Sequence, residues 1–208
     1  YIADGHHRSA SACKVGIKRR EEHPDYTGDE EFNFFMAVIF PDNDLKIFDY
    51  NRVVKDLNGN SKEEFLDKIR EAGFEVEEKG SEIYHPEGKH IFSMFLDGSW
   101  YKLTAKDSII PDHVTESLDV AVLQNNVLHP ILGIEDPRTD KRIDFVGGIR
   151  GLEELEKRVN DDMEVAFAVY PVDVDDLLSV ADNNMVMPPK STWFEPKLGS
   201  GLFLHSLK

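Results

Sequence analysis

The sequence contains a single cysteine, Cys13, among its 208 residues. One thiol excludes an internal disulfide and any zinc site that needs several cysteines, and this low count is typical of a reducing cytoplasm. The small neighbours Ala10 and Ala12 favour a buried apolar position for the Cys13 side chain over a reactive thiol.

Long apolar runs and positive charge are also scarce. No stretch approaches the ~20 apolar residues that span a bilayer, and no signal peptide is recognisable at the start. Acidic residues outnumber basic ones by 40 to 24, which gives a formal net charge of −16. Such a surface repels phosphate backbones, so nucleic acid is disfavoured as a partner, with the basic stretch 14–20 as the local exception. We expect a cytoplasmic protein that acts on a small molecule and not on a membrane.

Several familiar catalytic motifs are missing. The sequence has no G-x-S-x-G, Walker A, paired C-x-x-C or dinucleotide-binding fingerprint. It therefore offers no support for a serine hydrolase, a P-loop enzyme or a Rossmann dehydrogenase.

The patterns that are present predict an α+β fold, with mixed or antiparallel sheets built from hairpins and with helices packed on them. The apolar run 32–40 predicts a buried strand that forms a hairpin with 45–54. We expect one domain over residues 1–208. Because it begins on Tyr1 without a methionine, we also expect it to be part of a longer protein. Helices are predicted at 5–20, 61–72, 117–134, 151–160 and 174–184, and further strands at 74–78, 89–96, 99–105, 142–148, 164–172 and within 187–207.

The opening stretch IADGHHR (2–8) is typical of a strand, a tight glycine turn and the first turn of a helix. The first-turn N–H groups lack helical partners and lie at the positive end of the helix dipole, so an anion docks readily there. Gly5 would let oxygens approach the backbone, and Arg8 could fork onto a phosphate. His6 or His7 could donate a hydrogen bond or carry a proton, while Asp4 could orient a histidine or share a Mg²⁺ ion. The plainer alternative is that Asp4 only caps the helix and the other side chains face solvent.

Three stretches make the sequence resemble the carboxy-terminal half of the DUF1015 family of bacterial and archaeal proteins of unknown function. They are IADGHHRSASA, LDVAVLQNNVLHPILGI and MPPKSTWFEPKLGSGLFLH. This resemblance implies that the amino-terminal half of the protein is missing and would be a partner of this chain.

The DGHHR motif is also similar to the G-x-x-R turn of the ParB/sulfiredoxin superfamily, which includes free-serine kinases and in which this turn binds nucleotide phosphates. That resemblance implies a phosphate-binding role for residues 5–8, with Asp4 directly before them.

Four other stretches each have a structural interpretation beside a functional one. MPPKSTWFEPK could hold an anion through Lys190 or Lys197, or could be a rigid loop. The glycine pair of DFVGG is explained about as well by a tight connection as by a second anion site. HPEGKH (85–90) favours a solvated loop over a metal site, and DVDD (173–176) favours a helix N-terminus.

The opening motif, together with its resemblance to the superfamily that includes free-serine kinases, implies phosphoryl transfer involving a small metabolite such as a hydroxyl amino acid, with Mg²⁺ and ATP or ADP as cofactors. A non-enzymatic nucleotide- or phosphometabolite-sensing module, or a phosphatase that uses the same anion pocket, remain alternatives. The catalytic candidates are Asp4, His6 and His7, and the phosphate-binding candidates are Gly5, Arg8 and Lys190.

Overall fold

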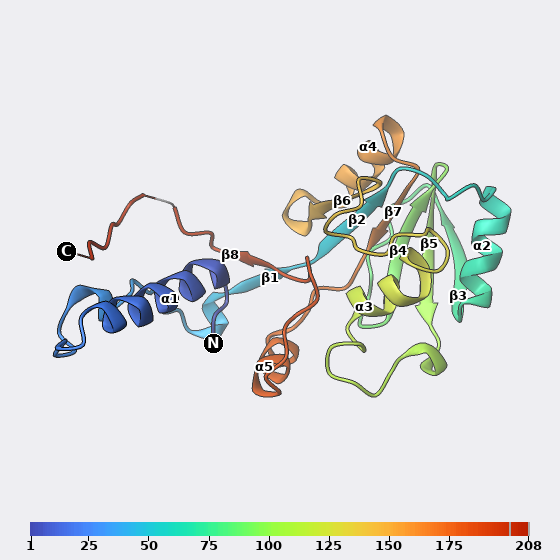
Figure 1. Cartoon of the computed structure of the whole chain (residues 1–208). Coiled ribbons are helices and arrows are strands. Elements are labelled where there is room, and N and C mark those ends of the chain that lie inside the picture. The colour runs from blue at the N-terminus through green and yellow to red at the C-terminus, as the bar shows by residue number, and fades with distance from the viewer. Residues whose placement is uncertain (200, 208) are drawn as a thin grey trace. The chain divides into compact units, whose positions relative to one another are not determined.

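A six-stranded antiparallel sheet organises most of the chain in the computed structural model, which describes residues 1–199 and 201–207 (Figure 1). The strand order is β3-β5-β4-β7-β2-β6, and each neighbouring pair is antiparallel. The α+β class expected from the sequence is therefore confirmed. The strands of this sheet are β2 (Tyr50–Val54), β3 (Phe74–Gly80), β4 (Ile91–Leu96), β5 (Ser99–Ala105), β6 (Ile143–Gly147) and β7 (Val165–Ala168).

The β4–β5 hairpin forms as predicted around Asp97 and Gly98. Both residues have positive φ, 49° and 75°, which is the backbone of a two-residue type I′ turn. Leu96 pairs with Ser99 directly across this turn. The turn residues therefore set the register of two strands in the sheet.

Both faces of the sheet are buried, and successive residues of a strand contribute to opposite faces. Along β4, Met94 and Leu96 belong to one apolar cluster, while Phe95 between them belongs to the other. Phe167 and Ala166 on β7 divide in the same way. This alternation follows from the two-residue period of a strand. The sheet therefore needs a helical cover on each side.

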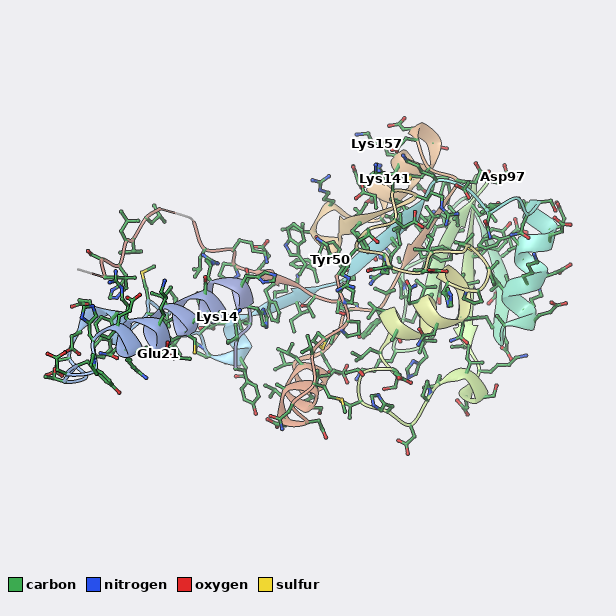
Figure 2. All side chains as sticks on the ribbon, viewed as in Figure 1. Lys14, Glu21, Tyr50, Asp97, Lys141 and Lys157 are labelled. Atoms are coloured by element: carbon green, nitrogen blue, oxygen red, sulfur yellow. The ribbon has the colours of Figure 1, made fainter. Side chains whose placement is uncertain are left out.

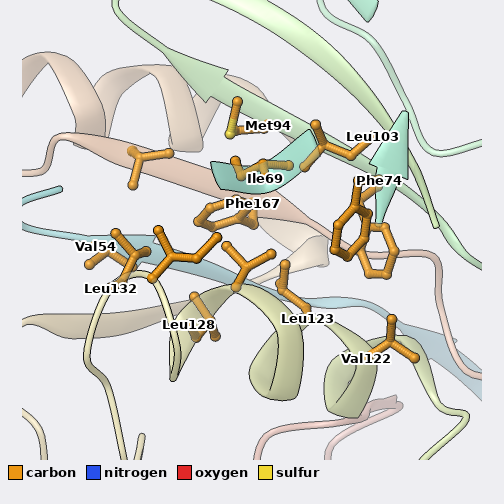
Figure 3. Packing of buried hydrophobic residues seen from close by; sticks show 14 of the residues in the cluster. Val54, Ile69, Phe74, Met94, Leu103, Val122, Leu123, Leu128, Leu132 and Phe167 are labelled. Carbon is orange, nitrogen blue, oxygen red and sulfur yellow. The ribbon is translucent and has the colours of Figure 1, made fainter. Parts of the chain in front are cut away.

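The helices provide that cover. Leu123 and Leu128, from α3 (Asp119–Leu123) and its π-helical continuation (Gln124–Leu128), face Phe167 and Ile69 in the larger cluster (Figure 3). Leu155 of α4 (Glu153–Asp161) belongs to the cluster on the opposite face. α5 (Val174–Asp182) adds Val180 to the larger cluster.

Helix α2 (Lys62–Glu71) begins at a complete capping box, as the sequence predicts. The Ser61 hydroxyl accepts a hydrogen bond from Glu64 N at 3.2 Å, and the Glu64 carboxylate accepts one from Ser61 N at 2.8 Å. Phe65 and Ile69 on its buried face are fully enclosed. The cap fixes where the helix starts, and thus which side chains reach the core.

Contacts between residues divide the chain into two compact units, Tyr1–Lys46 with Phe194–Lys208, and Ile47–Trp193. The chain passes between them within β1 (Lys46–Phe48) and β8 (Trp193–Glu195), which pair with each other. Folding as the one domain expected from the sequence remains a prediction.

The first unit contains α1 (His6–Glu22), from which Lys14 and Glu21 project (Figure 2). The predicted strand at 32–40 is wrong. A short 3₁₀ turn (Glu31–Asn33) is followed by irregular backbone, and Ile39 is 91% exposed. The expected partner stretch 45–54 forms β1 and β2 instead: β1 pairs with β8, and β2 has β6 and β7 on its two edges. The apolar run therefore has no free edge of β2 to join.

Cys13 is exposed, so the expectation of a buried thiol is also wrong. Among the described residues of α1 only Gly16 is buried. The backbone carbonyl of Phe32 passes there, 3.0 Å from where a Cβ would lie. α1 therefore contacts the segment at Phe32 through Gly16, and it has no buried apolar face among its described residues.

No helix of residues 1–199 and 201–207 combines the length and apolarity that crossing a membrane requires.

The Ser61→Ala substitution is expected to lower the free energy of unfolding by about 1 kcal/mol, because it removes the acceptor for the Glu64 N–H. Urea unfolding followed by circular dichroism measures this change. Ser81→Ala, at an exposed turn position, is the matched control and should leave the midpoint unchanged. Equal effects of the two substitutions would contradict a stabilising role for the cap.

Candidate functional site

The opening motif folds as a glycine turn that leads directly into α1. Gly5 is the residue before the helix and has a φ of 82°, a left-handed conformation that glycine adopts without strain. Asp4 Oδ1 accepts a hydrogen bond from Gly5 N at 2.8 Å, and no side chain caps the helix. Asp4 therefore does not cap α1, whereas the other part of that alternative, exposed side chains at 6–8, agrees with the structure.

The first turn of α1 presents three backbone donors. None of the described residues accepts a hydrogen bond from the N–H groups of His6, His7 or Arg8, while Ser9 N already donates to Gly5 O at 3.0 Å. All three side chains are exposed. The unpaired amides and the positive end of the helix dipole thus lie together among exposed residues.

The guanidinium of Arg8 folds back over the turn. Its Nη2 and Nε atoms lie 3.2 and 3.3 Å from the point where a Cβ on Gly5 would be. A side chain at position 5 would therefore compete with Arg8 for this space. Because Gly5 has no side chain, the Arg8 guanidinium can lie over the turn that leads into the unpaired N–H groups of α1.

Asp4 is held in place by a lysine from the far end of the sequence. Its Oδ2 lies 3.1 Å from Lys197 Nζ. Partial burial raises the pKa of Asp4, but hydrogen bonds from Lys197 and from Gly5 N lower it by more, so the net shift is downward. The carboxylate is therefore ionised at neutral pH and partly neutralised by Lys197.

Lys190 lies in the second unit, so its predicted grouping with the opening motif remains a prediction. Its Nζ lies 3.4 Å from the hydroxyl of Tyr50 and 5.1 Å from the centre of that ring; Tyr50 is labelled in Figure 2. Its backbone carbonyl accepts a hydrogen bond from the buried Arg52 guanidinium at 2.9 Å. The exposed ammonium is available to an anion, but its immediate partners are aromatic.

The glycine pair Gly147 and Gly148, where β6 ends and a 3₁₀ turn begins, has a packing role. A Cβ on Gly147 would lie 2.6 Å from the Trp193 ring, and one on Gly148 would lie 1.9 Å from Asp49 Oδ1. Gly148 N also donates to Asp49 O at 2.9 Å. These close contacts therefore explain the glycine pair without a second anion site.

The HPEGKH and DVDD stretches are joined by Lys89, whose Nζ lies 2.8 Å from both Asp173 and Asp176. Asp173 caps α5 by accepting from Asp176 N at 2.8 Å, as expected. The 85–90 stretch is a loop, also as expected. Across the part of the chain that the structure describes, no three His, Cys, Asp or Glu side chains converge on a metal position.

A buried carboxylate that the sequence analysis missed lies next to this loop. Asp119, the first residue of α3, is 6% exposed, and its Oδ1 accepts a hydrogen bond from His90 N at 2.8 Å. Burial raises the pKa of Asp119 to about 6, although contacts with His90 act in the opposite direction. In the sequence, an acid at a helix start looks like an ordinary cap. His90 and Asp119 are 29 positions apart, so only the fold shows that they are in contact.

A family model described as a protein of unknown function (DUF1015) matches residues 1–121. That range includes the opening motif and ends before MPPKSTWFEPK. No curated protein matches the chain.

Solved structures that resemble the chain include a variant of a free serine kinase in complex with AMP, at 16% identity and a TM-score of 0.47. The likeness covers 93% of this chain and 66% of that one. A conserved hypothetical protein from Pyrococcus furiosus matches at 17% identity over 93% of this chain and 68% of that one, with a TM-score of 0.48. The chain thus spans about two thirds of the length of these proteins.

The Asp119→Asn substitution is expected to stabilise the protein at pH 7.5, by up to about 3 kcal/mol, since the pKa of Asp119 rises from 3.8 to about 6 and each unit of pKa shift corresponds to about 1.4 kcal/mol. The folded pKa lies above the unfolded one, so the folded state takes up a proton between about pH 4 and 6 and loses stability as the pH rises through that window. The gain from Asn should therefore shrink towards pH 4.5. Thermal unfolding at the two pH values measures it.

Asp112→Asn is the matched control, because this nearby carboxylate is exposed. A loss of stability in Asp119→Asn at both pH values would show instead that the charge of Asp119 stabilises the fold.

Proposed function

We propose that this chain, which belongs to the DUF1015 family, binds the phosphates of a nucleotide at residues 4–8 and serves phosphoryl transfer involving a small hydroxyl-bearing metabolite. A hydroxyl amino acid is the acceptor class that the motif resemblance implies. The site is built on a helix start, where the backbone itself supplies the donors.

One observation supports the proposal most strongly, the N–H groups of His6, His7 and Arg8, which have no acceptor among the described residues and lie at the turn over which the Arg8 guanidinium folds. Phosphate oxygens accept from several donors at once, and the helix dipole favours their negative charge. The guanidinium adds a charge-assisted fork that can neutralise charge developing during transfer. Neutral ligands would gain little from this combination.

The neighbouring side chains have roles that fit the same chemistry. His6 or His7, both exposed on the first turn, would donate a hydrogen bond or a proton to the transferred group. Asp4, ionised and fixed by Lys197, would orient a histidine or offer one carboxylate oxygen to a Mg²⁺ ion. Mg²⁺ commonly binds through one or two carboxylates together with the substrate's own phosphates, so one carboxylate is a sufficient protein contribution. Lys190 would add a further positive charge.

The Arg8→Ala substitution is expected to weaken binding of ADP or ATP with Mg²⁺ at least tenfold, since hydrogen bonds to charged groups contribute about 1.5–3 kcal/mol. Isothermal titration calorimetry measures the affinity. Arg19→Ala, in the last turn of the same helix beside Glu22, is the matched control and should bind as the unsubstituted chain does. Equal affinities in all three proteins would exclude the proposed cradle.

Turnover separates the candidate functions that share this cradle. Transfer of a phosphoryl group to serine, detected as phosphoserine, would support the kinase. Tight binding without transfer or hydrolysis would favour the nucleotide- or phosphometabolite-sensing module, and release of inorganic phosphate from phosphoserine would favour the phosphatase. Lys190→Ala tests the remaining residue, because it should weaken nucleotide binding only if Lys190 completes the site.

A further inference from the structure

A cavity of about 300 Å³ lies at one edge of the sheet in the unit Ile47–Trp193. Its lining includes Asp49 directly before β2, Gly148 directly after β6, Tyr170 in the segment after β7 and His85 in the loop before β4. Because β4, β7, β2 and β6 are adjacent and antiparallel, these four segments meet at the same edge. At roughly 30 Å³ for one water in the liquid, the cavity has room for about ten non-hydrogen atoms.

The position of Asp49 in this cavity is fixed by the residue that follows β6. The carbonyl of Asp49 accepts a hydrogen bond from Gly148 N at 2.9 Å, and its Oδ1 occupies the space that a Cβ on Gly148 would need. Glycine at position 148 therefore leaves room for the carboxylate. Asp49 is partly exposed and lines the cavity, so its side chain is accessible to a ligand there.

The charge of Asp49 already has a counterpart inside the fold. Arg52 is buried, and its guanidinium donates to the carbonyls of Tyr50 and Lys190. The charges of Asp49 and Arg52 stabilise each other. Burial raises the pKa of Asp49, while nearby groups that include Arg52 lower it by less. A ligand at this carboxylate therefore does not need to carry a positive charge.

The rest of the lining disfavours an anion or a metal ion. Among the described residues that line the cavity there is no lysine or arginine, so an anion would meet the Asp49 carboxylate without a strong counter-charge. Glu153, whose carboxylate lies over Gly151, is exposed, and solvent screens its charge. Nowhere in residues 1–199 and 201–207 do three ligating side chains converge on a metal position. An uncharged ligand fits this lining best.

The polar and apolar parts of the cavity suit a ligand that alternates hydroxyl and CH groups. Pro86, Val169 and Pro171 give it apolar walls, as is usual for sites that bind small molecules through a few placed polar groups. In its ionised form the Asp49 carboxylate accepts several hydrogen bonds at once, and bonds to a charged acceptor are the stronger kind. The imidazole of His85 can donate or accept one more.

We propose that this cavity binds a neutral polyol of about five carbons, whose hydroxyls donate hydrogen bonds to the Asp49 carboxylate and whose CH groups pack against Pro86 and Pro171. A further hydroxyl exchanges a hydrogen bond with His85. This inference is independent of nucleotide binding at residues 4–8, because every residue it uses lies in the other unit of the chain.

Xylitol is the probe, because it is uncharged and has five carbons and five hydroxyls. Saturation-transfer NMR on the whole chain at pH 7.5, without nucleotide, should show saturable binding with a dissociation constant of about 1–10 mM, as expected for a ligand of this size. Asp49→Asn should weaken binding at least fivefold, because an amide oxygen accepts more weakly than a carboxylate. Asp112→Asn, which changes an exposed carboxylate outside the cavity, should leave the affinity unchanged.

His85→Ala gives a second test at an exposed position, where the loss of the imidazole should weaken xylitol binding at least twofold. Circular dichroism of each variant confirms that it is folded. The proposal is overturned if xylitol shows no saturable binding, if Asp49→Asn binds like Asp112→Asn, or if His85→Ala binds like the unsubstituted chain. It is also overturned if butane-1,4-diamine or inorganic phosphate displaces xylitol and binds more tightly, because the cavity would then recognise charge.

Discussion

The central strands of the antiparallel sheet are buried on both faces, and the rest of the unit Ile47–Trp193 follows from this constraint. β4, β7 and β2 lie in the middle of the sheet order and have both edges paired. Their side chains alternate between two apolar clusters, so each face requires a layer of helix. α3 and α4 provide these layers on opposite sides of the sheet.

The candidate sites occupy the places where this packing ends. His90 precedes the first residue of β4 and Asp119 is the first residue of α3, so a strand start and a helix start hold the pair in position. The turn at Gly5 precedes α1 in the other unit. In α1 the first turn contributes backbone N–H groups without acceptors among the described residues, and in α3 the first residue contributes the acid itself. The candidate residues therefore lie at the ends of helices and strands, whereas the core is packed from the middles of these elements.

Local signals in the sequence predicted much of the fold. The Asp97–Gly98 turn, the capping box at Ser61 and the helix start after Gly5 depend on neighbouring residues, and each forms as expected. The prediction of a strand at 32–40 was wrong because a strand needs the free edge of another strand to pair with. The apolar pattern does not show which strand edges are free. The contact between His90 and Asp119 was missed for a related reason, since only the complete fold brings such distant positions together. The residues of the opening motif could be selected because one short stretch contains all of them, whereas the relation of Lys190 to that motif depends on the arrangement of the whole chain.

The two most buried charged side chains of the unit Ile47–Trp193, Arg52 and Asp119, differ in how their hydrogen bonds are satisfied. The Arg52 guanidinium donates to the carbonyls of Tyr50 and Lys190 and stacks 5.6 Å from the centre of the Phe145 ring. Burial lowers its pKa to about 10, so it remains charged at neutral pH, and its bonds hold the loop of Lys190 against β2. Asp119 has the same degree of enclosure but keeps one oxygen without a donor among the described residues. A charge whose hydrogen bonds are satisfied within the fold can be explained by structure alone. Among the described residues, the carboxylate of Asp119 accepts a hydrogen bond at one oxygen only, from His90 N, and its raised pKa reflects the cost of burying it.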